Sequence, residues 1–237
     1  MTPLSDLVKI CDLLHINFDL VTNVYNFGSH VHGTATIDSD FDLMIVGNIK
    51  QRQLIFKKPR DPYFAEYQLY NINLDEKKYD ITIYSNENFE LMIKQNFMII
   101  IESLFNKAKF IPINKIDYKQ IYITKYMNDP SIRRALQNEL NYSLFCYKKY
   151  TQNLLSDNLD SFWVVKKLFN ALRYHESCLQ LLQDREIYDV TKLNNVKNTI
   201  TQLHSANTPI KEIYDYIYDL INIYNSKIKT VIGDILL

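Results

Sequence analysis

The amino-acid sequence predicts an α/β fold of the α+β type, in which a mixed β-sheet backed by helices precedes a helical domain. Two observations predict it. Between residues 21 and 84, apolar and polar side chains alternate in short segments, as they do in strands. Further along, apolar side chains recur every three or four positions, as they do in amphipathic helices, in residues 131–155, 161–183 and 208–232. We therefore expect one domain over residues 1–110 and a helical domain over residues 111–237.

The first elements are a helix and two strands. Thr2-Pro3 is expected to supply the N-cap and the first residue of the helix. Its expected buried stripe recurs at helical spacing and consists of Leu4, Leu7, Val8, Cys11 and Leu14. Strands are predicted from Val21 to Phe27 and from Phe41 to Gly47.

A hairpin and a helical segment complete the first part of the chain. Glu66 to Leu74 and Lys78 to Tyr84 each alternate as strands, with a turn between them. Helical spacing returns from Asn86 to Lys107. Within this segment the apolar run from Phe97 to Phe105 belongs in a core, so Glu102 in that run requires either a partner or an exposed face.

A glycine and several aspartates lie at or near the beginnings and ends of the predicted strands. Gly28-Ser29 follows the first strand, and Asp40 and Asp42 stand at the start of the second. Because side chains alternate along a strand, these two aspartates share one face, and Asp80 has the same phase in the last predicted strand. Paired carboxylates suit two Mg²⁺ ions about 3.5–4 Å apart, and a glycine lets backbone N–H groups approach phosphate. Asp-x-Asp alone is common in turns, but the combination indicates a nucleoside triphosphate site.

Two histidines lie between the glycines of this segment. His30 and His32 form a His-x-His pair, which on a strand would point both rings the same way, as in a transition-metal site. Here the pair follows a Gly-Ser turn, and no further nitrogen or sulfur ligand is near in the sequence. We therefore expect these histidines to be solvated or to neighbour a phosphate.

Composition narrows the class of protein. With 27 basic and 27 acidic residues among 237, the chain is neutral, which argues against a large non-specific nucleic-acid surface. Cys11, Cys146 and Cys178 are far apart and form no C-x-x-C pair, so neither a disulfide framework nor a zinc site is indicated. The sequence has no signal-peptide pattern and no apolar run of membrane-spanning length. We therefore expect a soluble, cytoplasmic protein with no membrane partner.

A resemblance to a known family adds to this interpretation. The pattern G-S-x-x-x-G-T-A…S-D-x-D-L, in residues 28–35 and 39–43, resembles the signature of the nucleotidyltransferase fold of the DNA polymerase β superfamily. Within that superfamily it is most similar to the predicted nucleotidyltransferases of the RNA-repair branch, whose members more often carry Arg at the position of His30. The resemblance implies a catalytic domain over residues 1–110.

The resemblance also implies a set of site residues. Gly28 and Ser29 would bind the β- and γ-phosphates of a triphosphate such as ATP. Three carboxylates would act as catalytic groups and hold two Mg²⁺ or Mn²⁺ ions, namely Asp40, Asp42 and Asp80. Of these, Asp80 would also accept the proton of the attacking hydroxyl.

The predicted helix over residues 161–183 carries further candidates. Its expected buried stripe is Phe162, Val165, Leu168, Phe169 and Leu172. Lys166, Asn170 and Arg173 are spaced four and three apart and share a separate polar face. The segment from Lys166 to Arg173 resembles a Lys-to-Arg block of the same family, which implies that these residues hold the triphosphate. Lys167 is the alternative to Lys166, and an ordinary solvated helix face is the other interpretation.

These observations lead to one principal hypothesis and two alternatives. The principal one is a Mg²⁺-dependent nucleotidyltransferase that moves an NMP from a nucleoside triphosphate to a hydroxyl acceptor. The family's association with RNA repair favours an RNA 3′ end as that acceptor. One alternative is transfer of AMP to a protein hydroxyl, as in antitoxin-type relatives. The other is a catalytically silent module that binds a nucleotide.

Overall fold

The computed structural model describes residues 3–49, 67–106, 113–128, 130–138, 141 and 161–232. The chain divides into two compact units, Met1–Met127 and Asn128–Leu237, which are described separately. This division falls later in the sequence than the predicted boundary at residue 110. Within the described ranges, none of the helices is both long and apolar enough to cross a membrane.

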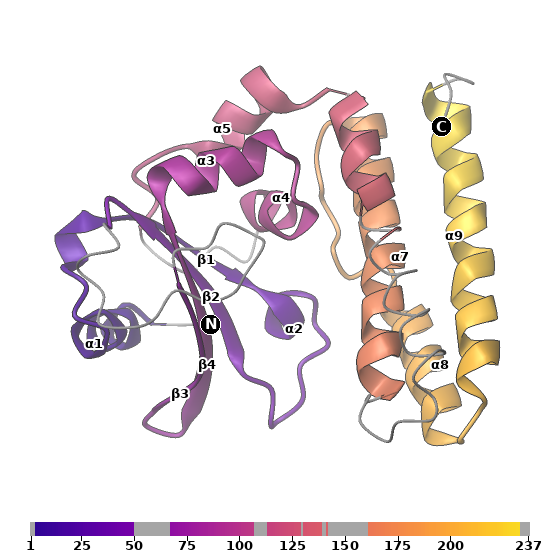
Figure 1. Ribbon diagram of the computed structural model, residues 1–237, viewed down its shortest axis with the longest axis horizontal. Helices are drawn as coiled ribbons and strands as arrows, with labels where there is room; N and C mark the ends of the chain where they lie inside the picture. The colour runs from indigo at the N-terminus through magenta and orange to yellow at the C-terminus, as the bar shows by residue number, and fades with distance from the viewer. Residues whose placement is uncertain are drawn as a thin grey trace. The chain divides into compact units, whose positions relative to one another are not determined.

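The first unit is built on a four-stranded mixed sheet with the strand order β1-β2-β4-β3 (Figure 1). The strands are β1 (Val21–Phe27), β2 (Phe41–Gly47), β3 (Tyr67–Leu74) and β4 (Lys77–Ser85). β2 runs antiparallel to β1 and parallel to β4, and β3 runs antiparallel to β4. All four predicted strands are confirmed to within a residue at each end, apart from Glu66, which lies outside the described residues.

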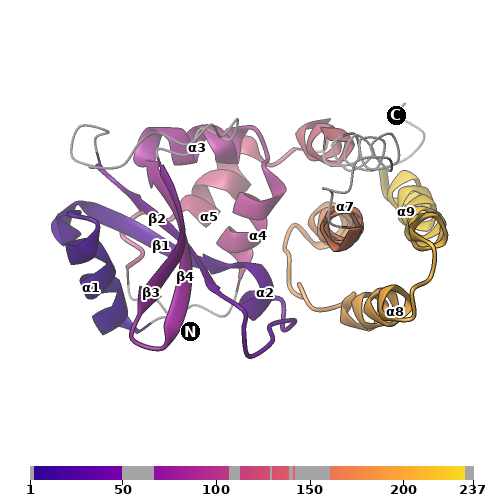
Figure 2. The same cartoon turned by 60° about the horizontal axis from the view of Figure 1, so that its bottom comes forward.

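Helix α1 (Leu4–Leu13) covers one face of this sheet (Figure 2). Its buried apolar side chains, with that of the following residue, are Leu7, Ile10, Cys11 and Leu14. They pack against strand residues such as Leu43, Ile45 and Ile81. The predicted stripe was wrong at Leu4 and Val8, which are exposed, because the helix turns Ile10 toward the sheet instead. Pro3 is the N-cap rather than the first helical residue, and Thr2 lies outside the described residues.

Three helices cover the opposite face of the sheet (Figure 2). They are α3 (Asn86–Lys94), α4 (Met98–Phe105) and α5 (Tyr118–Ile121), which continues into a π-helical turn (Tyr122–Tyr126). The Phe89 ring on α3 packs 5.4 Å from Tyr25 of β1 and 5.0 Å from Tyr118 of α5. The helical segment predicted over residues 86–107 is thus two helices. They are separated at Asn96, whose φ of +56° breaks the helical path and whose side chain accepts a hydrogen bond from the Tyr122 hydroxyl at 2.8 Å.

The segment beyond residue 112 belongs to the first unit because it is bonded to β1. The buried Asn23 amide group donates to the Ile116 carbonyl at 2.8 Å, and its oxygen accepts from the Ile116 N–H at 3.2 Å. Asn23 also forms an isolated antiparallel bridge with Asn114. These bonds join the segment to the sheet, so the boundary between the two units comes after it.

The second unit is helical. Of the predicted 131–155 helix, the structure describes residues 131–138 and 141, and these are helical. The other helices of this unit are α7 (Ser161–Asp184), α8 (Asn194–Ser205) and α9 (Ile210–Ile232). α7 packs against α9, and both helices carry fully buried side chains, such as Leu172 and Ile217. α8 was not predicted, because its only buried residue is Ile200 and a helix of this kind has little apolar periodicity.

The apolar stripe predicted on the 161–183 helix is buried at Val165, Leu168, Phe169 and Leu172. The Phe162 side chain lies outside the described residues. Of the predicted polar face, Lys166 is exposed, Asn170 is half-buried and Arg173 is buried, so only the first turn of this face lies at the surface.

Candidate active site

The segment between β1 and β2 begins at a glycine that touches a carboxylate. Gly28 begins α2 (Gly28–Val31) with a φ of +73°, a backbone conformation that favours glycine. A Cβ atom at this position would lie 1.8 Å from Oδ2 of Asp42. The absence of a side chain therefore lets the backbone of Gly28-Ser29 lie directly against the Asp42 carboxylate. This contact is a reason for glycine here beyond the approach of a phosphate.

Two carboxylates lie next to each other in the sheet. Asp42 of β2 and Asp80 of β4 are register partners on neighbouring parallel strands. On its other side Asp42 is in register with Phe27, the residue before Gly28. Partners in register point to the same face of a sheet, and both aspartates are half-buried. Gly28, Asp42 and Asp80 are thus brought together by strand pairing across the middle of the sheet.

Asp40 stands directly before β2, and the structure fixes both of its neighbours through His30. Nε2 of His30 lies 3.1 Å from the Ser39 carbonyl oxygen, and because a carbonyl only accepts, Nε2 carries the proton. The His30 ring also stacks on the Phe41 ring, with centroids 4.1 Å apart and planes 6° from parallel. A residue of α2 therefore holds the backbone on either side of Asp40. This positioning role was missed from the sequence, which carries no signal for it.

The donor chemistry of these positions fits a divalent cation. Carboxylate oxygens are the ligands that Mg²⁺ prefers, and Asp42 and Asp80 present a pair of carboxylates at one register position. In the part of the chain that the structure describes, no group of three His, Cys, Asp or Glu side chains is arranged to hold a metal ion. The candidate cation ligands of the first unit are therefore Asp42 and Asp80, together with Asp40, which lies two residues before Asp42.

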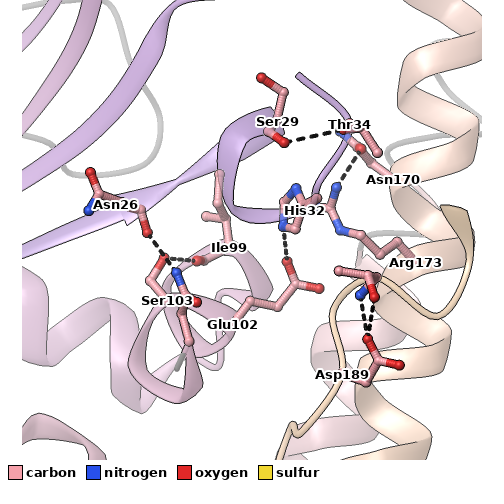
Figure 3. A network of polar contacts seen from close by, with 12 residues as sticks. Asn26, Ser29, His32, Thr34, Ile99, Glu102, Ser103, Asn170, Arg173 and Asp189 are labelled. Carbon is pink, nitrogen blue, oxygen red and sulfur yellow. Dashed lines mark hydrogen bonds and ion pairs between the residues drawn. The ribbon is translucent and has the colours of Figure 1, made fainter. Parts of the chain in front are cut away.

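His32 is not solvated, which corrects the sequence-based expectation. Its side chain is buried, and Nε2 lies 3.5 Å from Oε2 of Glu102 on α4, as Figure 3 shows. Glu102 is only 3% exposed, so this histidine is the partner that a carboxylate in an apolar run requires. The pair connects the end of the Gly28–Gly33 segment to the helix layer behind the sheet. Since His30 and His32 have different partners, they do not form a metal-binding pair.

The candidates on α7 lie together within the second unit. Nη1 of Arg173 donates to Oδ1 of Asn170 at 3.1 Å, so these residues share a face as predicted (Figure 3). Lys166 is exposed on the same helix, and Lys167 is half-buried. Lys197 of α8 is influenced by the charges of this helix. Burial lowers the pKa of the Lys197 ammonium group, and the positive charges of Lys166 and Arg173 lower it further.

The first unit thus has a mixed sheet, Gly-Ser directly after β1, and an aspartate on each of the paired strands β2 and β4. These features are typical of enzymes that transfer nucleotidyl groups. Residues 5–128, more than half of the chain, match the family described as "Nucleotidyltransferase domain". The chain belongs to this family. The protein is therefore a transferase whose domain moves an NMP from a nucleoside triphosphate, and such domains generally use divalent metal ions. The match is to the domain family as a whole, so membership of the RNA-repair branch stays a prediction.

Comparison with other proteins adds one structural likeness. A nucleotidyltransferase-like protein from Exiguobacterium sibiricum has 8% sequence identity and a TM-score of 0.33, with 92% of this chain and 74% of that protein covered. At this TM-score the likeness carries no argument about the site, so the family assignment depends on the sequence match. None of the curated proteins matches the chain in sequence.

Proposed function

We propose that this protein is a Mg²⁺-dependent nucleotidyltransferase that adds an NMP to a hydroxyl group, and that the acceptor is an RNA 3′ end. The observation that carries the proposal is the register of the sheet. Asp42 and Asp80 are partners on neighbouring strands, and the Gly28 backbone lies against the first of them. A triphosphate-binding segment and a pair of cation ligands are thereby next to each other.

Five residues of the first unit have roles in the proposed reaction. Asp40, Asp42 and Asp80 hold divalent cations, which are Mg²⁺ or Mn²⁺, and Gly28 and Ser29 bind the β- and γ-phosphates. When bound, two such cations neutralise the negative charge of the phosphates. Asp80 accepts the proton of the acceptor hydroxyl as the hydroxyl oxygen bonds to the α-phosphorus. The bond from that phosphorus to the leaving pyrophosphate breaks in line with the attack.

Residues of the second unit contribute to nucleotide binding in this proposal. Lys166, Asn170 and Arg173 bind phosphate oxygens. A guanidinium fixed by the Asn170 side chain can offer two parallel N–H donors to a phosphate. Lys167, one position further along α7, is the alternative to Lys166.

The choice of acceptor is supported by the resemblance of residues 28–43 to the RNA-repair branch. Transfer of AMP to a protein hydroxyl uses the same attack on the α-phosphorus and differs only in what enters the site. The chemistry of the carboxylates is the same for both acceptors, so an experiment has to distinguish RNA from protein.

The test is a transfer assay with the full-length protein. Each of the four α-labelled nucleoside triphosphates is incubated with Mg²⁺ or Mn²⁺ and with either an RNA pool or total cell protein. Asp42→Asn and Asp80→Asn remove a cation ligand with little change in shape, so each should reduce transfer by at least about 10²-fold. Asp12→Asn changes an exposed aspartate on α1 and is the matched control, which should transfer at the wild-type rate.

The outcomes separate the alternatives. Label in RNA that disappears in both site variants supports the proposal, and label in protein that disappears in them moves the acceptor to a protein hydroxyl. Transfer that survives Asp42→Asn would remove this carboxylate from the mechanism. Stabilisation by nucleotide without transfer to either acceptor would identify a silent nucleotide-binding module.

A further inference from the structure

The Gly28–Gly33 segment has few bonds of its own to keep it in one conformation. Its helix α2 is a single turn, and a glycine with a positive φ stands at each end of the segment. The His32 N–H donates to the Gly28 carbonyl at 3.1 Å, and the Thr34 N–H donates to the Ser29 carbonyl at 2.9 Å. One turn of helix is unstable alone, and glycine adds backbone freedom. Contacts with other elements must therefore hold this segment.

Helix α4 is a firmly packed element next to the segment. It packs against β1, the strand that leads into Gly28. Its buried apolar side chains are Met98, Ile100, Ile101, Leu104 and Phe105. Because these side chains anchor α4 in the core of the first unit, polar groups that α4 carries are held in fixed positions.

Two side chains at the C-terminal end of α4 contact residues on either side of α2. Glu102 and Asn106 are four positions apart, so they lie one above the other along the helix. Oε2 of Glu102 is 3.5 Å from Nε2 of His32, the residue that ends α2 (Figure 3). Nδ2 of Asn106 donates at 3.4 Å to the carbonyl of Asn26, two residues before Gly28. One helix thus holds the chain before and after the turn.

Burial makes the contact between Glu102 and His32 costly to break. Glu102 is 3% exposed and His32 is 7% exposed. A carboxylate removed from water is destabilising when a polar partner moves away from it, because water cannot take the partner's place. Movement of α2 away from α4 is therefore opposed by the loss of this pair.

We infer that Glu102 and Asn106 are positioning residues that keep the Gly28–Gly33 segment in the conformation that binds phosphate, and that nucleotide affinity therefore depends on α4. The inference rests on the proposed function for the role of Gly28 and Ser29. Both side chains act through the backbone of the segment. A segment that is already ordered loses less conformational entropy when its ligand binds, so loosening it should weaken phosphate binding.

The test uses the full-length protein and three variants. Glu102→Gln removes the charge with little change in shape. Asn106→Leu has a side chain of similar size that cannot donate a hydrogen bond. Glu90→Gln is the matched control, because it makes the same change on α3, where Glu90 accepts a hydrogen bond from the Tyr126 hydroxyl at 2.7 Å.

Three quantities are measured for each variant. They are the melting temperature, the hydrogen-exchange rates of the His32 and Thr34 amides by NMR, and the dissociation constant for inorganic tripolyphosphate with Mg²⁺ by titration calorimetry. The exchange rates report how often the two backbone bonds of the segment open. The tripolyphosphate probes the phosphate chain alone, without a base or a sugar.

A positioning role and a merely structural role give different results. Each variant loses one polar contact, so all three should melt roughly 2–4 °C below the wild type. Only the α4 variants should exchange the His32 and Thr34 amides faster. The increase should be roughly tenfold in Glu102→Gln and about threefold in Asn106→Leu, whose hydrogen bond is long.

Tripolyphosphate binding should weaken by the same factors. Loss of a negative charge by itself favours an anion, so weaker binding by Glu102→Gln reports the conformation of the segment rather than its charge. The inference would be overturned by exchange no faster in Glu102→Gln than in Glu90→Gln, or by wild-type affinity for tripolyphosphate in Glu102→Gln. If Glu102→Gln does not fold, Glu102→Asp replaces it and is judged by the same outcomes, since it keeps the charge but shortens the reach.

The transfer assay separates binding from chemistry in the same variants. The segment holds the phosphates both before and during the reaction. Loosening it in Glu102→Gln should therefore raise KM for the nucleotide by roughly tenfold and change kcat by less than about threefold. A fall in kcat at an unchanged KM would overturn the assignment of Glu102 to phosphate binding.

The inference and the proposed function can fail independently. Hydrogen exchange is also compared between Asp42→Asn and a protein that carries both Asp42→Asn and Glu102→Gln. Faster exchange of the His32 and Thr34 amides in the double variant supports the positioning role even if no acceptor is ever modified. Loss of transfer in Asp42→Asn tests the proposed function and leaves the positioning role untouched.

Discussion

Replacement of Gly28 by alanine should separate the stability of this protein from its activity. Two costs arise at this position. The φ of +73° is unfavourable for alanine by about 1–2 kcal/mol. The new Cβ would also start 1.8 Å from Oδ2 of Asp42, whereas real Cβ contacts are essentially never shorter than 3.0 Å, so the carboxylate must move by more than 1 Å.

These two costs have different consequences. The backbone term should lower the melting temperature by roughly 2–4 °C for each kcal/mol in a protein of this size. Displacement of a cation ligand by about 1 Å should instead reduce the transfer rate by about 10²-fold. We therefore expect Gly28→Ala to be folded, slightly destabilised and nearly inactive.

Gly33→Ala is the matched control. Gly33 has a φ of +65° and an exposed position, so alanine there carries a similar backbone cost. Melting curves and the α-labelled transfer assay are run on both variants. If Gly28→Ala and Gly33→Ala lose stability equally and also keep equal activity, the contact between Gly28 and Asp42 has no catalytic importance.

Three further predictions concern polar groups of the first unit. Glu102→Leu removes one partner of a buried pair and should lower the free energy of unfolding by about 3–5 kcal/mol. A double variant that also carries His32→Leu should lose less stability than the sum of the two single variants. Additive losses, measured by urea unfolding, would contradict the pairing. The hydrogen bond from Lys77 lowers the pKa of Asp6 below 3.8, so this carboxylate stabilises the fold above that pH and its contribution disappears as the pH falls through its lowered pKa. The stability difference between wild type and Asp6→Asn should accordingly be largest near neutral pH and shrink in acid, whereas a constant difference from pH 7 to pH 2 would disagree. His30→Phe keeps a ring that can stack on Phe41 but loses the N–H that donates to the Ser39 carbonyl, directly before Asp40. We expect kcat to fall roughly tenfold, with little change in KM for the nucleotide or in melting temperature. An unchanged kcat would show that the hydrogen bond is dispensable.

Local patterns in the sequence were sufficient for the strands of the first unit. The strands from Val21 to Phe27 and from Phe41 to Gly47 have the predicted bounds because alternation with a period of two is written in consecutive residues. The helix that carries Arg173 and Asn170 was predicted for the same reason, since its 24 residues give the apolar spacing room to repeat.

Local patterns failed where packing chose between similar residues. Ile10 rather than Leu4 faces the sheet, although both are apolar and near the same stripe. α8 offers only one buried side chain, Ile200, so its periodicity is too weak to be seen against its polar composition. The single helix expected over residues 86–107 is divided at Asn96, where a bond to a distant tyrosine offsets a strained backbone.

The sequence by itself determined which residues have the chemistry for a nucleotidyltransferase site, because Gly28 directly follows a strand and the side chains of Asp40, Asp42 and Asp80 share a phase on two later strands. Only the tertiary structure decided which residues these and the neighbouring side chains contact. The contacts of Gly28 with Asp42 and of His32 with Glu102 join residues that are 14 and 70 positions apart. Periodicity indicates which face of a helix or strand a side chain occupies. It holds no information about which other element, distant in the sequence, packs against that face.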